Sequence, residues 1–255
     1  MIKVTYIQHS SYLVELDHTL LLFDYFPPDA LSDRMVFGGK IPAFPQDKKL
    51  YVFASHRHRD HWTPEVLAWQ KTRHPDISYI LSDDIHIPRD LLARLGHRGD
   101  REFKKRIHRV SPVSVYRVDD LVIQTLRSTD EGVAFYIEAE GLHIYHAGDL
   151  HWWNWGERGE LYCETIGRAY KHEVNRLAGK HIDLAFVVLD PRMKEGFSYG
   201  MDYFLEHIDC DLVFPCHLWR NYDLIDRYKR LPQAANFKDK IVDLTQENMI
   251  FEIEE

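Results

Sequence analysis

The sequence has few cysteines and no long hydrophobic run. Its 255 residues include three cysteines, an odd number at irregular spacing, so we expect no disulfide framework. This cysteine usage fits the reducing cytoplasm. No apolar run approaches the roughly 18 residues that a membrane helix requires. The amino terminus lacks the basic segment, apolar stretch and cleavage site of a signal peptide. These absences predict a cytoplasmic protein with no membrane partner.

The sequence also lacks an excess of basic charge. It has 32 Lys and Arg residues against 40 Asp and Glu residues, which gives a net charge of −8. An acidic chain is a poor general binder of phosphate backbones, so we expect a small-molecule substrate rather than a nucleic acid. The apolar fraction of 45% and the charged fraction of 28% are typical of a globular protein.

Short apolar segments dominate the first part of the chain. They predict strands over 2–7, 12–16, 20–23 and 50–54, followed by mixed strands and helices. Thr63 followed by proline predicts the start of a helix. The strongly charged segment 99–109 predicts a solvated turn or helix, and we find no composition break that marks a linker.

What the sequence has in abundance is histidine, with 16 residues. Four residues of metal-ligand type occupy six positions directly after the predicted strand over 50–54, namely His56, His58, Asp60 and His61. Imidazole and carboxylate groups are good ligands for zinc, manganese or iron. Histidines two positions apart on an extended turn can point at one ion, and Asp60 and His61 can hold a second. We therefore predict a metal site here, in preference to an exposed polar turn.

Two single residues further along the chain are candidate distant ligands. Asp149 follows a predicted strand over 142–146, and His217 follows a predicted strand over 212–215. Loops at strand ends are where functional sites are usually built. Each residue alone has an ordinary alternative, because an aspartate after glycine is commonly a turn former and a histidine at a strand end is commonly structural.

The order H-x-H-x-D-H, then G-D, then a late single histidine resembles the metallo-β-lactamase fold superfamily. His9-Ser10-Ser11 before an apolar strand, and an L-L-F-D segment ending at Asp24, resemble the branch that contains ascorbate-6-phosphate lactonase and related hydrolases. The resemblance spans about residues 3–220. It implies an α/β fold, a four-layer αββα sandwich of two mixed sheets with helices outside. Here it would form one domain over 1–255 with a Trp-rich helical insertion at about 152–178.

The resemblance also implies a ligand set and a mechanism. His56 and His58 would hold a first metal ion, Asp60, His61 and His217 a second, and Asp149 would bridge both. The implied cofactor is one or two divalent ions, zinc first and manganese or iron as alternatives. The implied nucleophile is a metal-bound hydroxide that hydrolyses an ester, lactone or phosphoester of a small molecule. Asp60 is the predicted catalytic residue, because a ligand that touches the nucleophile can orient it and transfer its proton.

One departure from the family pattern concerns the first metal. The family normally has another histidine shortly before the strand that leads to the G-D motif, but residues 126–132 contain none. Either Asp130 or Glu131 takes its place or the first site is weakened, and Asp130 is equally an ordinary turn residue before glycine. His58 favours hydrolysis over redox chemistry, since the diiron reductases of the superfamily usually have glutamate there.

Four further residues are candidates around the metal ligands. His9 and Asp24 are expected to orient ligands, with a turn histidine as the alternative for His9. His151 and Trp152 are expected to line a substrate pocket, with a loop hydrogen bond as the alternative for His151.

Other side chains near these motifs have a mainly structural interpretation. Trp152, Trp153 and Trp155 are expected to pack the inserted helix, with one ring facing the site. Arg192 and Lys194 could bind an anionic substrate group, but solvated loop charges are the favoured interpretation.

Two alternative functions remain open. A phosphodiesterase or nuclease of the same superfamily is disfavoured by the acidic net charge. A non-catalytic protein that binds a metal or ligand on a degenerate site is motivated by the missing histidine.

Overall fold

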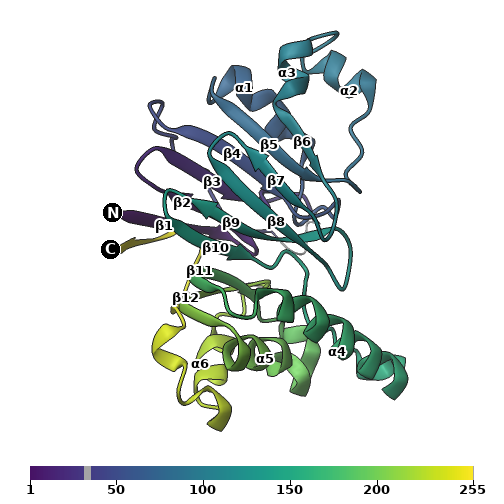
Figure 1. Ribbon diagram of the computed structural model, residues 1–255, viewed down its shortest axis with the longest axis vertical. Helices are drawn as coiled ribbons and strands as arrows, with labels where there is room; N and C mark the ends of the chain where they lie inside the picture. The colour runs from purple at the N-terminus through teal and green to yellow at the C-terminus, as the bar shows by residue number, and fades with distance from the viewer. Residues whose placement is uncertain (32–35, 255) are drawn as a thin grey trace. The chain divides into compact units, whose positions relative to one another are not determined.

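The computed structural model describes residues 1–31 and 36–254 (Figure 1). The chain divides into two compact units. The N-terminal unit comprises Met1–Ser111 with Glu247–Glu255, and the central unit comprises Pro112–Gln246. Within the described residues, the first unit contains a seven-stranded sheet and the second a six-stranded sheet. The prediction of two mixed sheets with helices is therefore confirmed. The prediction of a single domain over 1–255 stays a prediction.

The sheet of the N-terminal unit has the strand order β13-β1-β2-β3-β4-β5-β6. Its strands are β1 (Ile2–Gln8), β2 (Ser11–Glu15), β3 (Thr19–Phe23), β4 (Lys49–Ala54), β5 (Ile77–Ser82), β6 (Ile107–Val110) and β13 (Met249–Ile253). Strand β13 pairs antiparallel with β1, which is antiparallel to β2. Strand β2 is antiparallel to β3, and β3 to β6 are parallel. Strands β1, β3 and β4 therefore run in one direction, and their carboxyl ends lie at the same edge.

Strands β3 and β5 are buried at every position, and β4 at all but its first residue. Continuous apolar runs of this kind are typical of parallel strands that are covered on both faces. The covering elements in this unit are η1 (Pro64–Ala68), α1 (Trp69–Thr72), α2 (Arg89–Arg94) and α3 (Arg101–Lys105). Val66 and Trp69 bury their side chains in the same core as the strands.

Two predictions for this unit need correction. The helix predicted after Thr63 is a 3₁₀ segment followed by one α-helical turn. It ends at Thr72, since the proline three residues later disfavours helical backbone before it. The charged segment 99–109 contains α3, capped by Asp100 on the Phe103 N–H at 2.9 Å, but also strand β6. That strand was missed because it is a short edge strand with charged side chains, which is how edge strands avoid further pairing.

The sheet of the central unit has the order β12-β11-β10-β9-β8-β7. Its strands are β7 (Val115–Val118), β8 (Leu121–Arg127), β9 (Val133–Ala139), β10 (Leu142–His146), β11 (His181–Val188) and β12 (Asp209–Cys216). Strands β7 to β10 are antiparallel neighbours, and β10, β11 and β12 are parallel. The carboxyl ends of β10, β11 and β12 therefore share one edge, and the β8–β9 turn lies at that edge too.

The helices of the central unit are α4 (Glu160–Val174), α5 (Tyr199–His207) and α6 (Asp223–Lys229). Short 3₁₀ segments are η2 (Gly156–Arg158), η3 (Asn175–Leu177), η4 (Pro191–Ser198), η5 (Pro232–Ala234) and η6 (Lys238–Lys240). Helix α4 lies inside the stretch predicted as a helical insertion. The Tyr170 hydroxyl donates to the Gly200 carbonyl oxygen at 2.7 Å and so joins α4 to α5.

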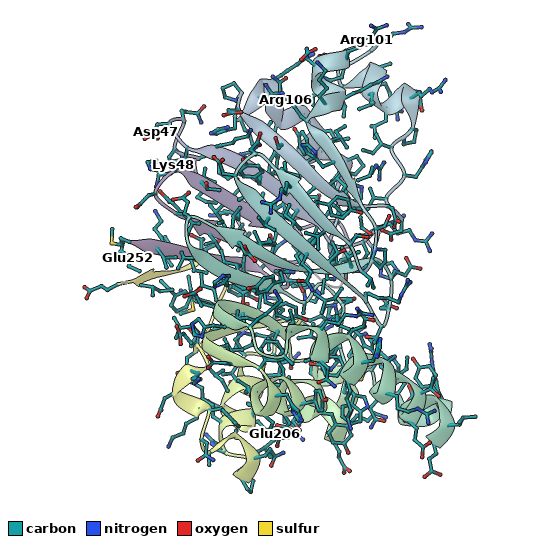
Figure 2. The ribbon with its side chains drawn as sticks, in the orientation of Figure 1. Asp47, Lys48, Arg101, Arg106, Glu206 and Glu252 are labelled. Atoms are coloured by element: carbon teal, nitrogen blue, oxygen red, sulfur yellow. The ribbon has the colours of Figure 1, made fainter. Side chains whose placement is uncertain are left out.

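The helices carry charge on their outer faces. Arg101 on α3 and Glu206 on α5 are exposed and point away from the strands of their own units (Figure 2). Among the residues that the structure describes, no helix is both long and apolar enough to cross a membrane.

Candidate metal centre

The histidine-rich loop of the N-terminal unit lies at the carboxyl edge of its sheet. His56 to His61 follow β4, Asp24 follows β3, and His9 follows β1. Because these three strands run in the same direction, their end loops meet, and this is the position where open α/β sheets bind ligands. We call His9, Asp24, Ser55, His56, His58, Asp60 and His61 the histidine cluster.

The carboxylate of Asp24 holds His61 and Ser55 of the histidine cluster in place. Its carboxylate is fully buried, and Oδ2 lies 2.7 Å from His61 Nδ1. Ser55 donates to the same carboxylate twice, from its backbone N–H and from its hydroxyl, both at 2.7 Å. With Nδ1 held in this way, His61 Nε2 faces Asp60 Oδ2 at 3.9 Å. A carboxylate that fixes the ring of a histidine through one nitrogen is the usual support of a metal-binding imidazole.

The other imidazoles of the cluster also converge. Ser55 Oγ lies 2.9 Å from His56 Nδ1, and His56 Nε2 lies 2.9 Å from His58 Nδ1. His9, fully buried, places Nε2 3.5 Å from Asp60 Oδ2. Ligand-type atoms of His9, Asp60 and His61 all lie within 4.8 Å of one another. The cluster therefore concentrates nitrogen and oxygen donors around small volumes, as a cation site requires.

Three candidate residues have a backbone conformation that is rare outside glycine. His9, Asp24 and His217 have φ values of 50°, 45° and 63°. The left-handed region costs a non-glycine residue about 1–2 kcal/mol. Such conformations concentrate at functional sites, where the surrounding structure enforces them.

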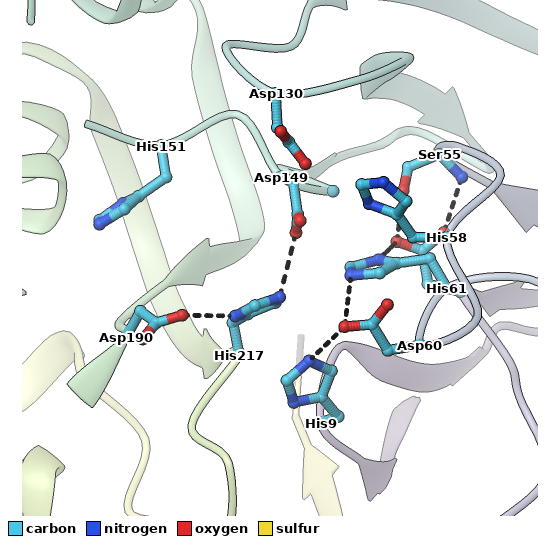
Figure 3. Close-up of polar contacts among 12 residues, drawn as sticks. His9, Ser55, His58, Asp60, His61, Asp130, Asp149, His151, Asp190 and His217 are labelled. Carbon is cyan, nitrogen blue, oxygen red and sulfur yellow. Dashed lines mark hydrogen bonds and ion pairs between the residues drawn. The ribbon is translucent and has the colours of Figure 1, made fainter. Parts of the chain in front are cut away.

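A second set of donors lies at the carboxyl edge of the central sheet. Asp149 follows β10, Asp190 follows β11, His217 follows β12, and Asp130 lies in the β8–β9 turn. We call these four residues the aspartate cluster. His217 Nδ1 lies 2.7 Å from Asp190 Oδ2, while Nε2 lies 3.4 Å from Asp149 Oδ1 (Figure 3). The pair Asp190–His217 therefore repeats the arrangement of Asp24–His61.

Sequence reasoning missed Asp190. Its signal was an aspartate two residues after the end of a buried strand, close to the position that Asp24 has directly after β3. Burial acts to raise the pKa of Asp190, but hydrogen bonds from His217 and Arg192 outweigh it and hold the pKa well below its usual range. Asp190 is therefore ionised at neutral pH and can hold His217 in one orientation.

Asp130 is exposed and lies close to Asp149. One carboxylate oxygen of each residue falls within 4.8 Å of the other. Thr129 Oγ1 donates to the His151 carbonyl oxygen at 2.6 Å and accepts from the His151 N–H at 3.0 Å, which ties the β8–β9 turn to the segment after β10. The Asp130 N–H also donates to Ser128 Oγ at 3.1 Å. The turn is thus fixed beside Asp149.

His151 and Trp152, the side chains predicted to line a pocket, pack against the helices of the central unit, and a role for them in a pocket stays a prediction. His151 is fully buried against α5, where a Cβ on Gly200 would lie 2.5 Å from its Nδ1. Burial lowers the pKa of His151 to about 4, so the ring is neutral at physiological pH. Trp152 packs on α4, where a Cβ on Gly167 would come within 2.6 Å of its ring. These close approaches explain why both helices have glycine at the contact.

Of the three tryptophans that follow the G-D motif, Trp153 contacts the aspartate cluster directly. Its ring centre lies 5.6 Å from that of His217, and its Nε1 donates to the Asp149 carbonyl oxygen at 3.0 Å. The expectation that one of the tryptophan rings faces the site therefore points to Trp153, whereas Trp152 has a packing position.

The family of the chain follows from comparison with known sequences. A profile described as "Beta-lactamase superfamily domain" matches residues 3–154, which is more than half of the chain. The chain belongs to the β-lactamase superfamily. No curated protein gives a significant match. The predicted superfamily is thus confirmed, and the narrower branch with ascorbate-6-phosphate lactonase stays a prediction.

Solved structures show the fold of this β-lactamase superfamily member. Igni18, a metallo hydrolase from the archaeon Ignicoccus hospitalis, is 18% identical with a TM-score of 0.55, over 99% of each chain. YhfI from Bacillus subtilis, a metallo-β-lactamase fold protein, is 15% identical with a TM-score of 0.56, over 99% of this chain and 100% of its own. CmlA, a diiron β-hydroxylase from Streptomyces venezuelae, is 12% identical with a TM-score of 0.61, over 99% of this chain and 54% of its own. At these identities the likeness establishes the metallo-β-lactamase fold alone.

A third group of histidine and carboxylate side chains lies at the other ends of β11 and β12. His181 places its two ring nitrogens 2.8 Å from Asp209 Oδ2 and 3.1 Å from Asp211 Oδ2, and Nε2 lies 3.8 Å from Asp183. All four are partly or fully exposed. We interpret the group as a solvated ion-pair network outside the ligand set of the superfamily.

We expect the His181 pKa to lie above its ordinary value of 6.5. The hydrogen bond to Asp209 stabilises the charged imidazole and outweighs the small effect of burial. This stabilisation is fully present below about pH 6.5 and is lost as the pH rises through the raised pKa. An NMR titration checks the value, and Asp209→Asn should return it toward 6.5. The same pKa in both proteins would contradict the assignment.

Proposed function

We propose that this protein is a metal-dependent hydrolase that acts on an ester, lactone or phosphoester of a small molecule. One observation carries the proposal. His61 and His217 are each held through Nδ1 by a buried carboxylate at 2.7 Å, while Nε2 faces a second carboxylate at 3.9 Å and 3.4 Å. Two ligand atoms bound to one zinc ion at about 2.0–2.2 Å lie roughly 3–4 Å apart. The Nε2–carboxylate spacing in each pair therefore suits a cation that both groups contact.

The donor chemistry also suits a divalent ion. The proposed ligands are His56, His58, Asp60, His61, Asp149 and His217, with Asp130 as a further carboxylate. A mixture of imidazole nitrogen and carboxylate oxygen is typical of zinc, manganese and iron sites. We propose one or two ions, zinc first and manganese or iron as alternatives.

The chain's own groups have separate tasks in this proposal. A bound divalent ion makes a water nucleophile available at neutral pH and polarises the substrate oxygen. Asp60 lies within reach of both His9 and His61, so its carboxylate can orient that water and accept its proton. Asp24 and Asp190 are positioning residues, because they fix the rings of His61 and His217.

Metal content tests the proposal directly. We would measure metals by mass spectrometry on protein purified without an affinity metal column, and then screen esters, lactones and phosphodiesters. The expected result is one or two ions per chain and a hydrolysis that a chelator removes and added metal restores. Protein that binds no zinc, manganese or iron, or that holds metal but hydrolyses none of these substrates, would contradict it.

Asp130→Ala is expected to lower the affinity for one ion by at least about 10-fold, since it removes a carboxylate beside Asp149. Asp120→Ala, at an exposed aspartate in the turn between β7 and β8, is the control for the loss of one carboxylate in the same unit. Competition with a coloured chelator measures both variants. Equal stoichiometry and affinity in Asp130→Ala and the parent would remove Asp130 from the ligand set.

We also propose a small-molecule substrate, no nucleic-acid partner and a cytoplasmic location. The net charge of −8 supports the first two. The thiols of Cys163, Cys210 and Cys216 are all free, which supports a reducing compartment.

A further inference from the structure

Asp190 makes more contacts than the support of one histidine needs. Besides His217, it accepts hydrogen bonds from the Arg192 backbone N–H at 2.7 Å and from Arg192 Nε at 3.0 Å to each oxygen. Arg192 Nη2 lies 2.6 Å from Oδ2. Trp219 Nε1 adds a longer contact to Oδ2 at 3.3 Å. Both carboxylate oxygens are thus engaged, so the group cannot rotate about its own axis without losing several bonds.

Arg192 is itself held in place by aromatic rings. Its side chain is 43% exposed, a position in which an arginine usually moves freely. The guanidinium centre lies 4.7 Å from the ring of Trp219, 5.4 Å from Trp155 and 5.8 Å from Trp153. Cation–π attraction over three rings restricts that motion. Trp153 and Trp155 also stack in parallel, with centres 6.0 Å apart.

The same rings contact the histidine that Asp190 supports. The ring centre of His217 lies 5.6 Å from Trp153 and 5.4 Å from Trp219. Three tryptophan rings therefore surround a chain of contacts that runs from Arg192 through Asp190 to His217. We call these rings, Trp153, Trp155 and Trp219, the cage. This places the Trp-rich segment and the arginine after β11 around one imidazole.

We propose that Arg192 is a positioning residue that acts through Asp190 to fix the ring of His217 with Nε2 directed at Asp149. The inference rests on the proposed function in one respect, that His217 binds metal. The planar guanidinium matches the carboxylate with two parallel donors, which a lysine ammonium cannot do. The charge of Arg192 alone is therefore insufficient, and its fork geometry is required.

The test compares Arg192→Met and Arg192→Lys with Arg227→Met. Arg227 is a matched control, an exposed arginine of the same unit that lies 4.4 Å from the ring of Phe197. The first readout is the ¹⁵N NMR spectrum of the His217 ring in metal-free protein, which reports the Nδ1 hydrogen bond. The second is zinc affinity by chelator competition.

Both Arg192 variants are expected to lose the protected Nδ1 proton signal of His217 and to bind zinc at least about 10-fold more weakly. Arg227→Met should match the parent in both measurements. Full recovery in Arg192→Lys would show that charge alone suffices and overturn the proposal, as would a parent-like His217 spectrum in Arg192→Met.

Two further measurements separate a failure of this proposal from a failure to fold and from a failure of the proposed function. Trp155→Leu removes one wall of the cage without touching Asp190 and should shift both readouts in the same direction by a smaller amount, which covers the case in which an Arg192 variant does not fold. If the parent binds no metal, the proposed function fails, whereas the ¹⁵N signals of the metal-free protein still decide the role of Arg192.

Discussion

His61→Ala should abolish hydrolysis and remove at least one metal ion per chain. The ring of His61 is fixed through Nδ1 by the buried carboxylate of Asp24. Its loss removes a ligand and also leaves that carboxylate with one partner fewer. Leaving a buried acceptor without one of its hydrogen-bond partners typically costs about 1–3 kcal/mol. Metal analysis and a denaturant titration of the metal-free protein measure the two effects separately.

The matched control for this change is His86→Ala. His86 is an exposed histidine of the same unit that lies outside the histidine cluster. It should keep the metal content, the activity and the unfolding midpoint of the parent. Full metal content and activity in His61→Ala would show that His61 is not a ligand.

Asp190→Asn should lower zinc affinity and hydrolysis by about 10- to 100-fold, the usual effect of losing the group that orients a ligand. The amide keeps the shape of the side chain but lacks the charge that His217 and Arg192 pair with at 2.7 Å and 2.6 Å. The change therefore reduces the preference of His217 for the orientation with Nε2 toward Asp149. Isothermal titration with zinc gives the affinity, and initial rates give the loss of activity.

Asp239→Asn, at an exposed position of the same unit, controls for loss of one negative charge. Its zinc affinity should equal that of the parent. An Asp190→Asn protein with parent affinity would mean that the His217 ring is fixed by the surrounding tryptophans rather than by the carboxylate.

The parts of the fold that could be predicted from sequence were those governed by local pattern. Strand β10 and helix α5 lie at the predicted residues. Alternating apolar side chains indicate the strand, and apolar side chains at helical spacing, such as Met201 and Leu205, indicate the helix. The edge strand β6 was missed, because its polar side chains do not form the apolar pattern that indicates a buried strand. A short pattern does not tell which charged segment extends a sheet.

The residues of the site also fall into two groups, those that a local sequence pattern reveals and those that only the tertiary structure reveals. The spacing of His56 to His61 is local, so four donors in six positions were visible in the sequence. Asp190 was not, because its partner His217 is 27 residues away and an aspartate before proline is an ordinary loop residue. The choice among Trp152, Trp153 and Trp155 also needed the structure, since it depends on which ring meets glycine on a helix.

The pairing of β13 with β1 limits the order in which the N-terminal sheet can form during translation. Strand β1 is translated before the central unit, but the strand that covers its outer edge, Met249–Ile253, is translated only after that unit. Until then the open N–H and C=O groups of β1 can accept any other extended chain. The N-terminal unit is therefore completed after the central unit, although most of its residues are translated before it. A nascent chain that stops before residue 249 exposes the unpaired edge of β1, which can pair with other nascent chains on the same mRNA and aggregate.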